Sequence, residues 1–79
     1  MDLMKENMLM NMNMEALYIK DFVRYMPNAV DDIYFHLGKM TAYEEMYKEI
    51  FNEYIPESTQ KNITHACLAV YNWDAAGRC

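Results

Sequence analysis

Apolar residues return every three or four positions along most of this chain, which is the spacing of one face of an α-helix. The series is complete between residues 42 and 54, where positions i, i+3, i+4, i+7, i+8 and i+11 are all apolar. These positions hold Tyr43, Met46, Tyr47, Ile50, Phe51 and Tyr54. On another side, Glu45, Glu49 and Glu53 recur every four residues. The pattern predicts an amphipathic helix whose apolar stripe builds the core and whose carboxylate stripe faces outward.

Three further helices are predicted by the same spacing, over residues 14–26, 28–37 and about 59–75. Pro27 ends the first of them, because a proline drives the preceding residue out of the α-helical conformation. Asn28 is a suitable N-cap for the second. No run of β-branched residues competes with these helices. The predicted fold class is therefore all-α, a small bundle or array of about four short helices.

Local signals separate the second helix from the third. Gly38 lies where a left-handed C-terminal cap is wanted, and Thr41 with Glu44 forms a T-x-x-E capping box. The chain is therefore expected to turn between these two helices. Ser58 or Thr59 is expected to cap the last helix.

Residues 1–13 do not follow the helical spacing. From Met8 to Met14, methionines alternate with leucine or asparagine, a period of two rather than 3.6. We interpret residues 1–13 as a flexible extension, in the form of a frayed continuation of the helix, or as a partner-binding arm of a single helical domain that spans residues 1–79. The thioethers could attract Cu(I), but no cysteine or histidine lies near them in the sequence to complete such a site. We therefore expect no metal.

The N-terminal segment does not have the features of a signal peptide. Asp2 and Glu6 precede its apolar run, and asparagines interrupt that run. No segment of the sequence approaches the ~20 apolar residues that span a membrane. The sequence therefore predicts a soluble, cytoplasmic protein that does not contact membranes.

Methionine and tyrosine are abundant, with nine and seven residues in a chain of 79. Both side chains suit protein interfaces, since methionine adapts to irregular surfaces and tyrosine combines an apolar ring with a polar tip. A chain this short buries only about 60% of the surface that its unfolded form exposes, so a partner would add useful stability. We therefore expect a homodimer, joined through an aromatic face of the helix at 42–54 or of the first helix.

Histidine and cysteine offer few catalytic arrangements here. His36 and His65 belong to different predicted helices, and His36 follows Asp32 by one turn in a pair that could contribute to a metal site. Cys67 and His65 are two positions apart, so their side chains point in different directions on a helix. We expect Cys67 to be buried and Cys79 to be accessible. Both are interpreted as reduced thiols, and a bridge between them is the alternative.

Other catalytic motifs are missing from the sequence. Its two glycines are too few for a glycine-rich phosphate loop, and neither cysteine belongs to a C-x-x-C pair. We therefore predict that the protein is not an enzyme and has no catalytic residue, cofactor or metal. A metal-dependent bundle enzyme is a third class of function, behind two kinds of binding protein.

The net charge of −5 disfavours direct binding to nucleic acid or to anionic membranes, and it is compatible with a basic protein partner. The sequence predicts a small acidic protein-binding module that docks on a larger basic or nucleic-acid-binding protein and inhibits or regulates it. The candidate contact residues are Glu45, Glu49, Glu53, Tyr43, Tyr47 and Tyr54. Their three carboxylates imitate DNA only weakly, since a duplex carries about seven charges over ~12 Å.

In size and charge alone, the chain is similar to phage and mobile-element proteins that inhibit host defence, including anti-CRISPR proteins. That resemblance implies action in the cytoplasm of a host cell, at a basic nucleic-acid-binding site. The alternative is a regulatory homodimer, such as an acidic antitoxin or a transcription-associated subunit.

Overall fold

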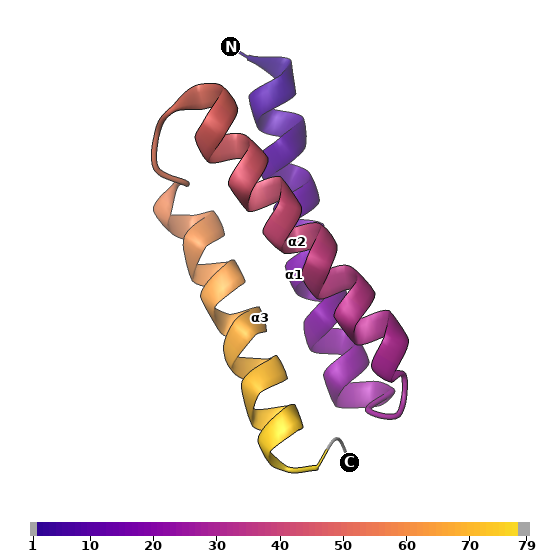
Figure 1. Cartoon of the computed structure of the whole chain (residues 1–79). Helices are drawn as coiled ribbons and strands as arrows, with labels where there is room; N and C mark the ends of the chain where they lie inside the picture. Colours follow the sequence, from indigo (N-terminus) through magenta and orange to yellow (C-terminus); the bar gives the residue numbers. More distant parts are fainter. Residues whose placement is uncertain (1, 78–79) are drawn as a thin grey trace.

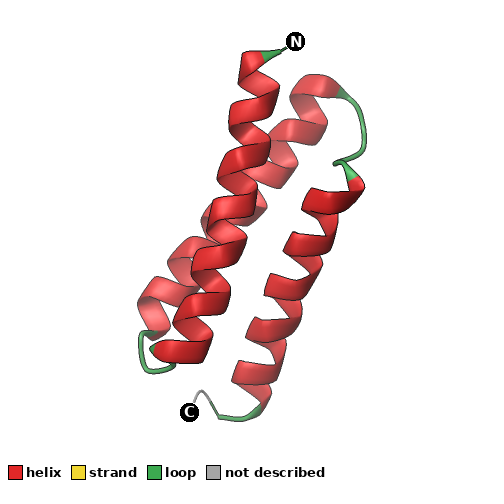
Figure 2. Cartoon of the chain, turned by 180° about the vertical axis from the view of Figure 1, so that it is seen from behind, coloured by secondary structure: helices red, strands yellow, loops and turns green. Residues whose placement is uncertain are grey.

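A computed structural model describes residues 2–77, and this part of the chain folds into three α-helices. They are α1 (Leu3–Tyr25), α2 (Val30–Phe51) and α3 (Glu57–Ala75). The chain runs along the bundle, back and along it again, with the two loops at opposite ends (Figures 1 and 2). The bundle is a rod that measures 42 × 17 × 17 Å. The predicted all-α class is confirmed, whereas the expected number of about four helices is wrong.

The difference in number arises in α2, which continues through the predicted break. Gly38 lies inside the helix, and Thr41 donates its hydroxyl to the carbonyl oxygen of Leu37 at 2.9 Å instead of capping a new helix. A glycine inside a helix costs only about 1 kcal/mol relative to alanine. Packing offsets this cost, because α2 presents one unbroken buried line to the core. The fully buried residues of that line recur every seven positions and are Ile33, Met40 and Tyr47.

Helix α1 includes the segment that was interpreted as an extension. Asp2 is its N-cap and accepts a hydrogen bond from the backbone N–H of Lys5 at 3.2 Å. The alternating methionines divide between two sides of this helix. Met8 and Met12, one turn apart, are buried in the core, whereas Met10 and Met14 are exposed. The period of two is therefore the sum of two helical stripes, one on each side.

The core lies along α1, which packs against both α2 and α3, while α2 and α3 contact each other little. On α3 the buried positions alternate in steps of four and three residues. The buried apolar residues of the whole bundle are Met8, Met12, Ala16, Ile19, Ile33, Met40, Tyr47, Ile55, Ile63, Ala66, Val70 and Trp73.

The predicted core stripe of residues 42–54 was too wide. Ile50 is 53% exposed, and Met46 is also exposed. The buried line of α2 is centred on Tyr47, and Phe51, four residues later, packs against the core. Three residues from Tyr47 a side chain has rotated about 60° from that line, and this rotation carries Ile50 to the outer edge.

The helix ends also differ from the expected caps. Ala29 rather than Asn28 precedes α2, and Pro56 is the N-cap residue of α3. Thr59 is buried in the first turns of α3 instead of capping it. Cys67 is exposed, contrary to expectation. It follows the buried Ala66 directly, so its side chain points away from the core. The prediction for Cys79, and that of a bridge to it, lie outside the described residues.

Candidate functional site

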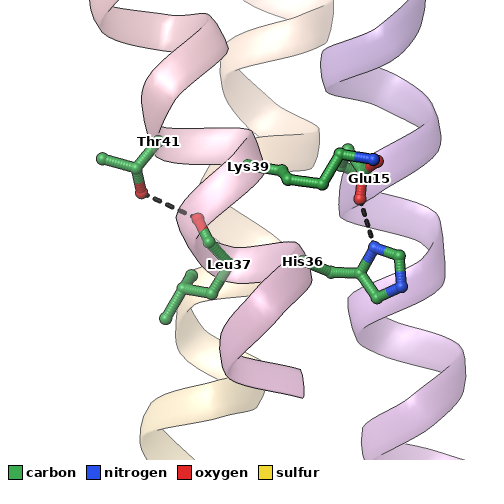
Figure 3. A network of polar contacts seen from close by, with 5 residues as sticks. All are labelled: Glu15, His36, Leu37, Lys39 and Thr41. Atoms are coloured by element: carbon green, nitrogen blue, oxygen red, sulfur yellow. Dashed lines mark hydrogen bonds and ion pairs between the residues drawn. The ribbon is translucent and has the colours of Figure 1, made fainter. Parts of the chain in front are cut away.

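A buried carboxylate joins α1 to α2 at the middle of the bundle. Glu15 of α1 is buried, and its Oε2 lies 2.5 Å from Nδ1 of His36 on α2 (Figure 3). Its other oxygen, Oε1, accepts from the ammonium group of Lys39 at 2.9 Å. A buried carboxylate is tolerated when its oxygens are paired, and here both oxygens are. The three side chains therefore fix the position of α2 along α1.

Aromatic rings complete the surroundings of His36. The ring centroids of Tyr18, Phe22 and Phe35 lie 5.4, 5.4 and 5.3 Å from that of the imidazole. The Lys39 ammonium lies 5.3 Å from the centroid of Phe35, and its hydrogen bond to Glu15 raises the pKa of Lys39. His36 therefore pairs with Glu15 of α1 and not with Asp32 of its own helix. The spacing of Asp32 and His36 in the sequence could not reveal this partner.

The cluster contains two side chains of the kinds that ligate metals, Glu15 and His36. Within residues 2–77, no group of three or more histidine, cysteine, aspartate or glutamate side chains could hold a metal ion. Glu15 is already engaged by an imidazole and an ammonium group. The arrangement provides hydrogen-bond partners for the buried carboxylate of Glu15.

A second polar cluster lies at one end of the bundle, where α1 begins and α2 ends. Asn52 ends α2 in the left-handed conformation, with φ of 51°, and Glu53 follows it. The Oε1 atom of Glu53 lies 2.7 Å from the Lys5 ammonium and accepts the Tyr47 hydroxyl at 2.8 Å. The bond from Lys5, and then that from Tyr47, lower the pKa of Glu53. Burial and the bond to Glu53 raise the pKa of Tyr47.

The six predicted contact residues therefore differ in how far their side chains are exposed to a partner. Tyr47 is 1% exposed and cannot meet a partner in this fold, which corrects its assignment. The carboxylate of Glu53 is engaged within the chain. The others range from half-buried Tyr43, which packs against the core, to Tyr54, which is 94% exposed in the loop after α2. Glu45 and Glu49 are exposed on α2, where they were expected.

The sequence did not show that two apolar side chains next to these glutamates are exposed. Met46 and Ile50 are 43% and 53% exposed and follow Glu45 and Glu49 directly along α2. The four residues form a strip on the outside of the helix, because residues three and four positions apart lie close together on its surface and Met46 lies three positions before Glu49. We call Glu45, Met46, Glu49 and Ile50 the α2 strip. Its apolar ridge runs beside a carboxylate ridge.

A larger apolar surface lies on α1, on the side away from the core. Leu3, Met10 and Leu17 recur every seven residues and are 72%, 54% and 55% exposed. Other exposed apolar residues of α1 flank this line. We call the whole surface the outer face of α1, and it consists of Leu3, Met10, Met14, Leu17, Tyr18 and Tyr25. The seven-residue spacing was its signal in the sequence, but the methionine alternation concealed it.

Two hollows lie along the outer face of α1. One is at the junction with the start of α3, where Met10, Met14 and Leu17 lie beside Pro56 and Thr59. The other is at the end of α1 and is lined by Tyr18, Asp21, Phe22, Tyr25 and Met26. The outer face of α1 therefore has both protruding side chains and apolar depressions that could receive them.

Comparison with known proteins found no matching family model and no significantly similar curated protein or solved structure. None of the helices within residues 2–77 has the length and apolar character needed to cross a membrane. Residues 2–77 form a small antiparallel three-helix bundle. Its two distinctive surfaces are the α2 strip and the outer face of α1.

Proposed function

We propose that this protein is a protein-binding module that docks on a larger protein and inhibits or regulates it through the α2 strip. The observation that carries the proposal is the exposure of Ile50, a large apolar side chain, on the same outer strip of α2 as the exposed Glu49. Protein interfaces commonly have an apolar centre and a charged rim. Ile50 and Met46 would supply such a centre, and Glu45 and Glu49 would supply its rim.

The charge of the strip indicates the chemistry of the partner. Glu45 and Glu49 are exposed, and the whole chain carries a net charge of −5. A basic site on the partner would attract this surface and accelerate association. Proteins that bind nucleic acid carry basic sites of this kind. An inhibitor that covers such a site would act as anti-CRISPR proteins of phages do, in the cytoplasm of the host cell.

The second candidate function is a regulatory homodimer, such as an acidic antitoxin or a transcription-associated subunit. The observation that favours it is the exposed outer face of α1, with its line of Leu3, Met10 and Leu17. The two functions use different surfaces and do not exclude each other.

A matched pair of substitutions tests the α2 strip. Ile50 on α2 and Leu68 on α3 are both 53% exposed, so Ile50→Ser and Leu68→Ser remove similar exposed apolar groups. The immobilised chain and its two variants would be used to capture proteins from cell extracts. A target identified with the unchanged chain should bind Leu68→Ser equally well and Ile50→Ser at least about tenfold more weakly.

The carboxylate ridge is tested in the same way. Glu49→Gln should slow association with that target and reduce its dependence on salt, because a charged group that steers encounter acts mainly on the association rate. Glu57→Gln, at another exposed glutamate, should leave both quantities unchanged. Equal affinities for Ile50→Ser and the unchanged chain, with an unaltered salt dependence for Glu49→Gln, would contradict the proposal.

A further inference from the structure

The outer face of α1 is a second apolar stripe on a helix whose first stripe is already buried. Met12 and Ile19 of the inner stripe are 0% exposed, whereas Leu3, Met10 and Leu17 of the outer stripe are more than half exposed. In Figure 2, α1 lies in front of α2, and its side away from α2 faces the viewer. Apolar patches that continue along a whole element commonly mark a surface that a partner covers.

We propose that a second copy of this chain covers the outer face of α1, with the two α1 helices packed antiparallel about a two-fold axis near Met14. The seven-residue recurrence of Leu3, Met10 and Leu17 is the spacing by which one helix maintains contact with another along its length. A two-fold pair uses the same surface on both copies. One self-complementary stripe is therefore sufficient.

The charges beside the stripe set the direction of the pair. Glu6 lies in the first turns of α1 and Arg24 in the last turn, and both are exposed. They are eighteen residues apart, which is five helical turns, so they lie on the same edge of the outer face. An antiparallel pair brings Glu6 of each copy to Arg24 of the other. A parallel two-fold pair would place the Glu6–Arg24 edges of the two copies on opposite sides of the seam, where these charges could not pair.

Asp21 supports the same direction. It is the carboxylate of α1 that lies between Leu17 and Tyr25, next to the hollow at the end of the helix. An antiparallel pair centred near Met14 places it opposite the amide of Asn7 in the other copy. In a parallel pair, two Asp21 carboxylates would face each other across an apolar seam, which is unfavourable.

The two hollows fit this arrangement. With the axis near Met14, Tyr18 of one copy lies opposite Met10 of the other, beside the hollow at the start of α3. The hollow at the end of α1 faces the first turns of the second helix, where Leu3 protrudes. Each copy therefore offers side chains to the depressions of the other. The α2 strips remain free, and the dimer would present two of them.

The first test is the mass of the full chain by sedimentation at micromolar concentrations, in a reducing buffer so that disulfides contribute nothing. A dimer of the 9.4 kDa chain is expected. Leu17→Glu should raise its dissociation constant by at least about tenfold. Leu68→Glu is the matched control, because Leu17 and Leu68 are 55% and 53% exposed. A monomer throughout this concentration range, or a dimer that Leu17→Glu leaves intact, would overturn the proposal.

The direction of the pair has its own test. Glu6→Arg and Arg24→Glu should each weaken the dimer, and the double variant should restore it, because only an antiparallel pair exchanges these two charges. Circular dichroism would confirm that each variant keeps its helices. Weakening without restoration in the double variant would overturn the antiparallel arrangement. Since target capture is measured with Ile50 and Glu49 variants, failure of the dimer is distinguishable from failure of the proposed function.

Discussion

Trp73 and Pro27 connect the last turns of α3 to the turn between α1 and α2. The indole Nε1 of Trp73 donates to the carbonyl oxygen of Pro27 at 2.8 Å, and the indole is buried. The ring of Tyr34 lies 5.7 Å from that of Trp73. Since α2 and α3 contact each other little, the indole is one of the groups that hold the three helices together at this end of the bundle, with the bond from the Tyr34 hydroxyl to Asp74.

Trp73→Phe should therefore lower the free energy of unfolding by about 1–3 kcal/mol, because it leaves the Pro27 carbonyl without this donor. Tyr71→Phe, at a neighbouring position that is 70% exposed, should change stability by less than ~0.5 kcal/mol. Urea unfolding followed by circular dichroism measures both. Equal stability of the two variants would show that the bond to Pro27 contributes nothing.

The pair of Ile33 and Ile50 tests which side of α2 forms the core. Ile33→Ala should cost about 2–5 kcal/mol, because the side chain is fully buried and its removal leaves a cavity. Ile50→Ala should change stability by only about 0.5 kcal/mol, since Ile50 is 53% exposed. The comparison uses the same substitution in the same helix. A larger loss for Ile50→Ala would restore the wider stripe that the sequence predicted.

The cluster of Glu15, His36 and Lys39 should respond unequally to truncation. His36→Ala should cost about 1.5–3 kcal/mol, because it removes a hydrogen bond from a buried carboxylate. Lys39→Ala should cost less than His36→Ala, because the lysine side chain is 41% exposed and an exposed ion pair contributes little. Thermal unfolding of both variants at one protein concentration makes the comparison. The reverse order would assign the pairing of Glu15 mainly to the lysine.

Glu53 should stabilise the protein at neutral pH, and this contribution should be lost in acid. Its hydrogen bonds lower its pKa below the ordinary value of 4.5, so the folded state favours the charged form. This contribution is present above pH 4.5 and is lost as the pH falls through the lower pKa of the folded state. Glu53→Gln should therefore be less stable than the unchanged chain at pH 7, and the difference should shrink below pH 4.5. Glu49→Gln is the control and should show no such convergence in urea unfolding.

Cys67 should react with thiol reagents in the folded protein. Its side chain is accessible, but partial burial and the charge of Glu44 raise its pKa above the ordinary value of 9.0. The thiolate is the reactive form, so labelling should accelerate as the pH rises toward and beyond 9.0. Glu44→Gln should accelerate it at pH 8. Labelling would be followed in a Cys79→Ser variant, so that only Cys67 reacts. If Cys67 were labelled only after unfolding, its exposed position would be contradicted.

The all-α class could be predicted because the helical spacing is clear over most of the chain after residue 13, and no alternation of β-branched residues competes with it. The number of helices could not, because Gly38 and Thr41 are local signals, whereas the buried line through Met40 is decided by contact with α1. Met8 and Met10 show the same limit. Each is a methionine in a regular alternation, and only the packing of α1 against two helices decides which one is buried.

The candidate site was predictable to a similar extent. Glu45 and Glu49 are exposed as the pattern indicated, but the spacing of Glu53 could not show that the left-handed Asn52 brings its carboxylate to Lys5. Pairings between residues far apart in the sequence, such as Lys5 with Glu53 or Glu15 with His36, leave no periodic signal.

The central position of α1 also has a consequence for synthesis of the protein. The helix that carries the core for both others precedes them along the chain, so it leaves the ribosome first, with both of its apolar sides bare. The adjacent α1–α2 hairpin can form as soon as α2 follows, because its contacts are local. We expect α3 to dock last, when Trp73 reaches Pro27. Until then a nascent chain exposes the groove that α3 will fill, and chaperones or neighbouring nascent chains compete for it.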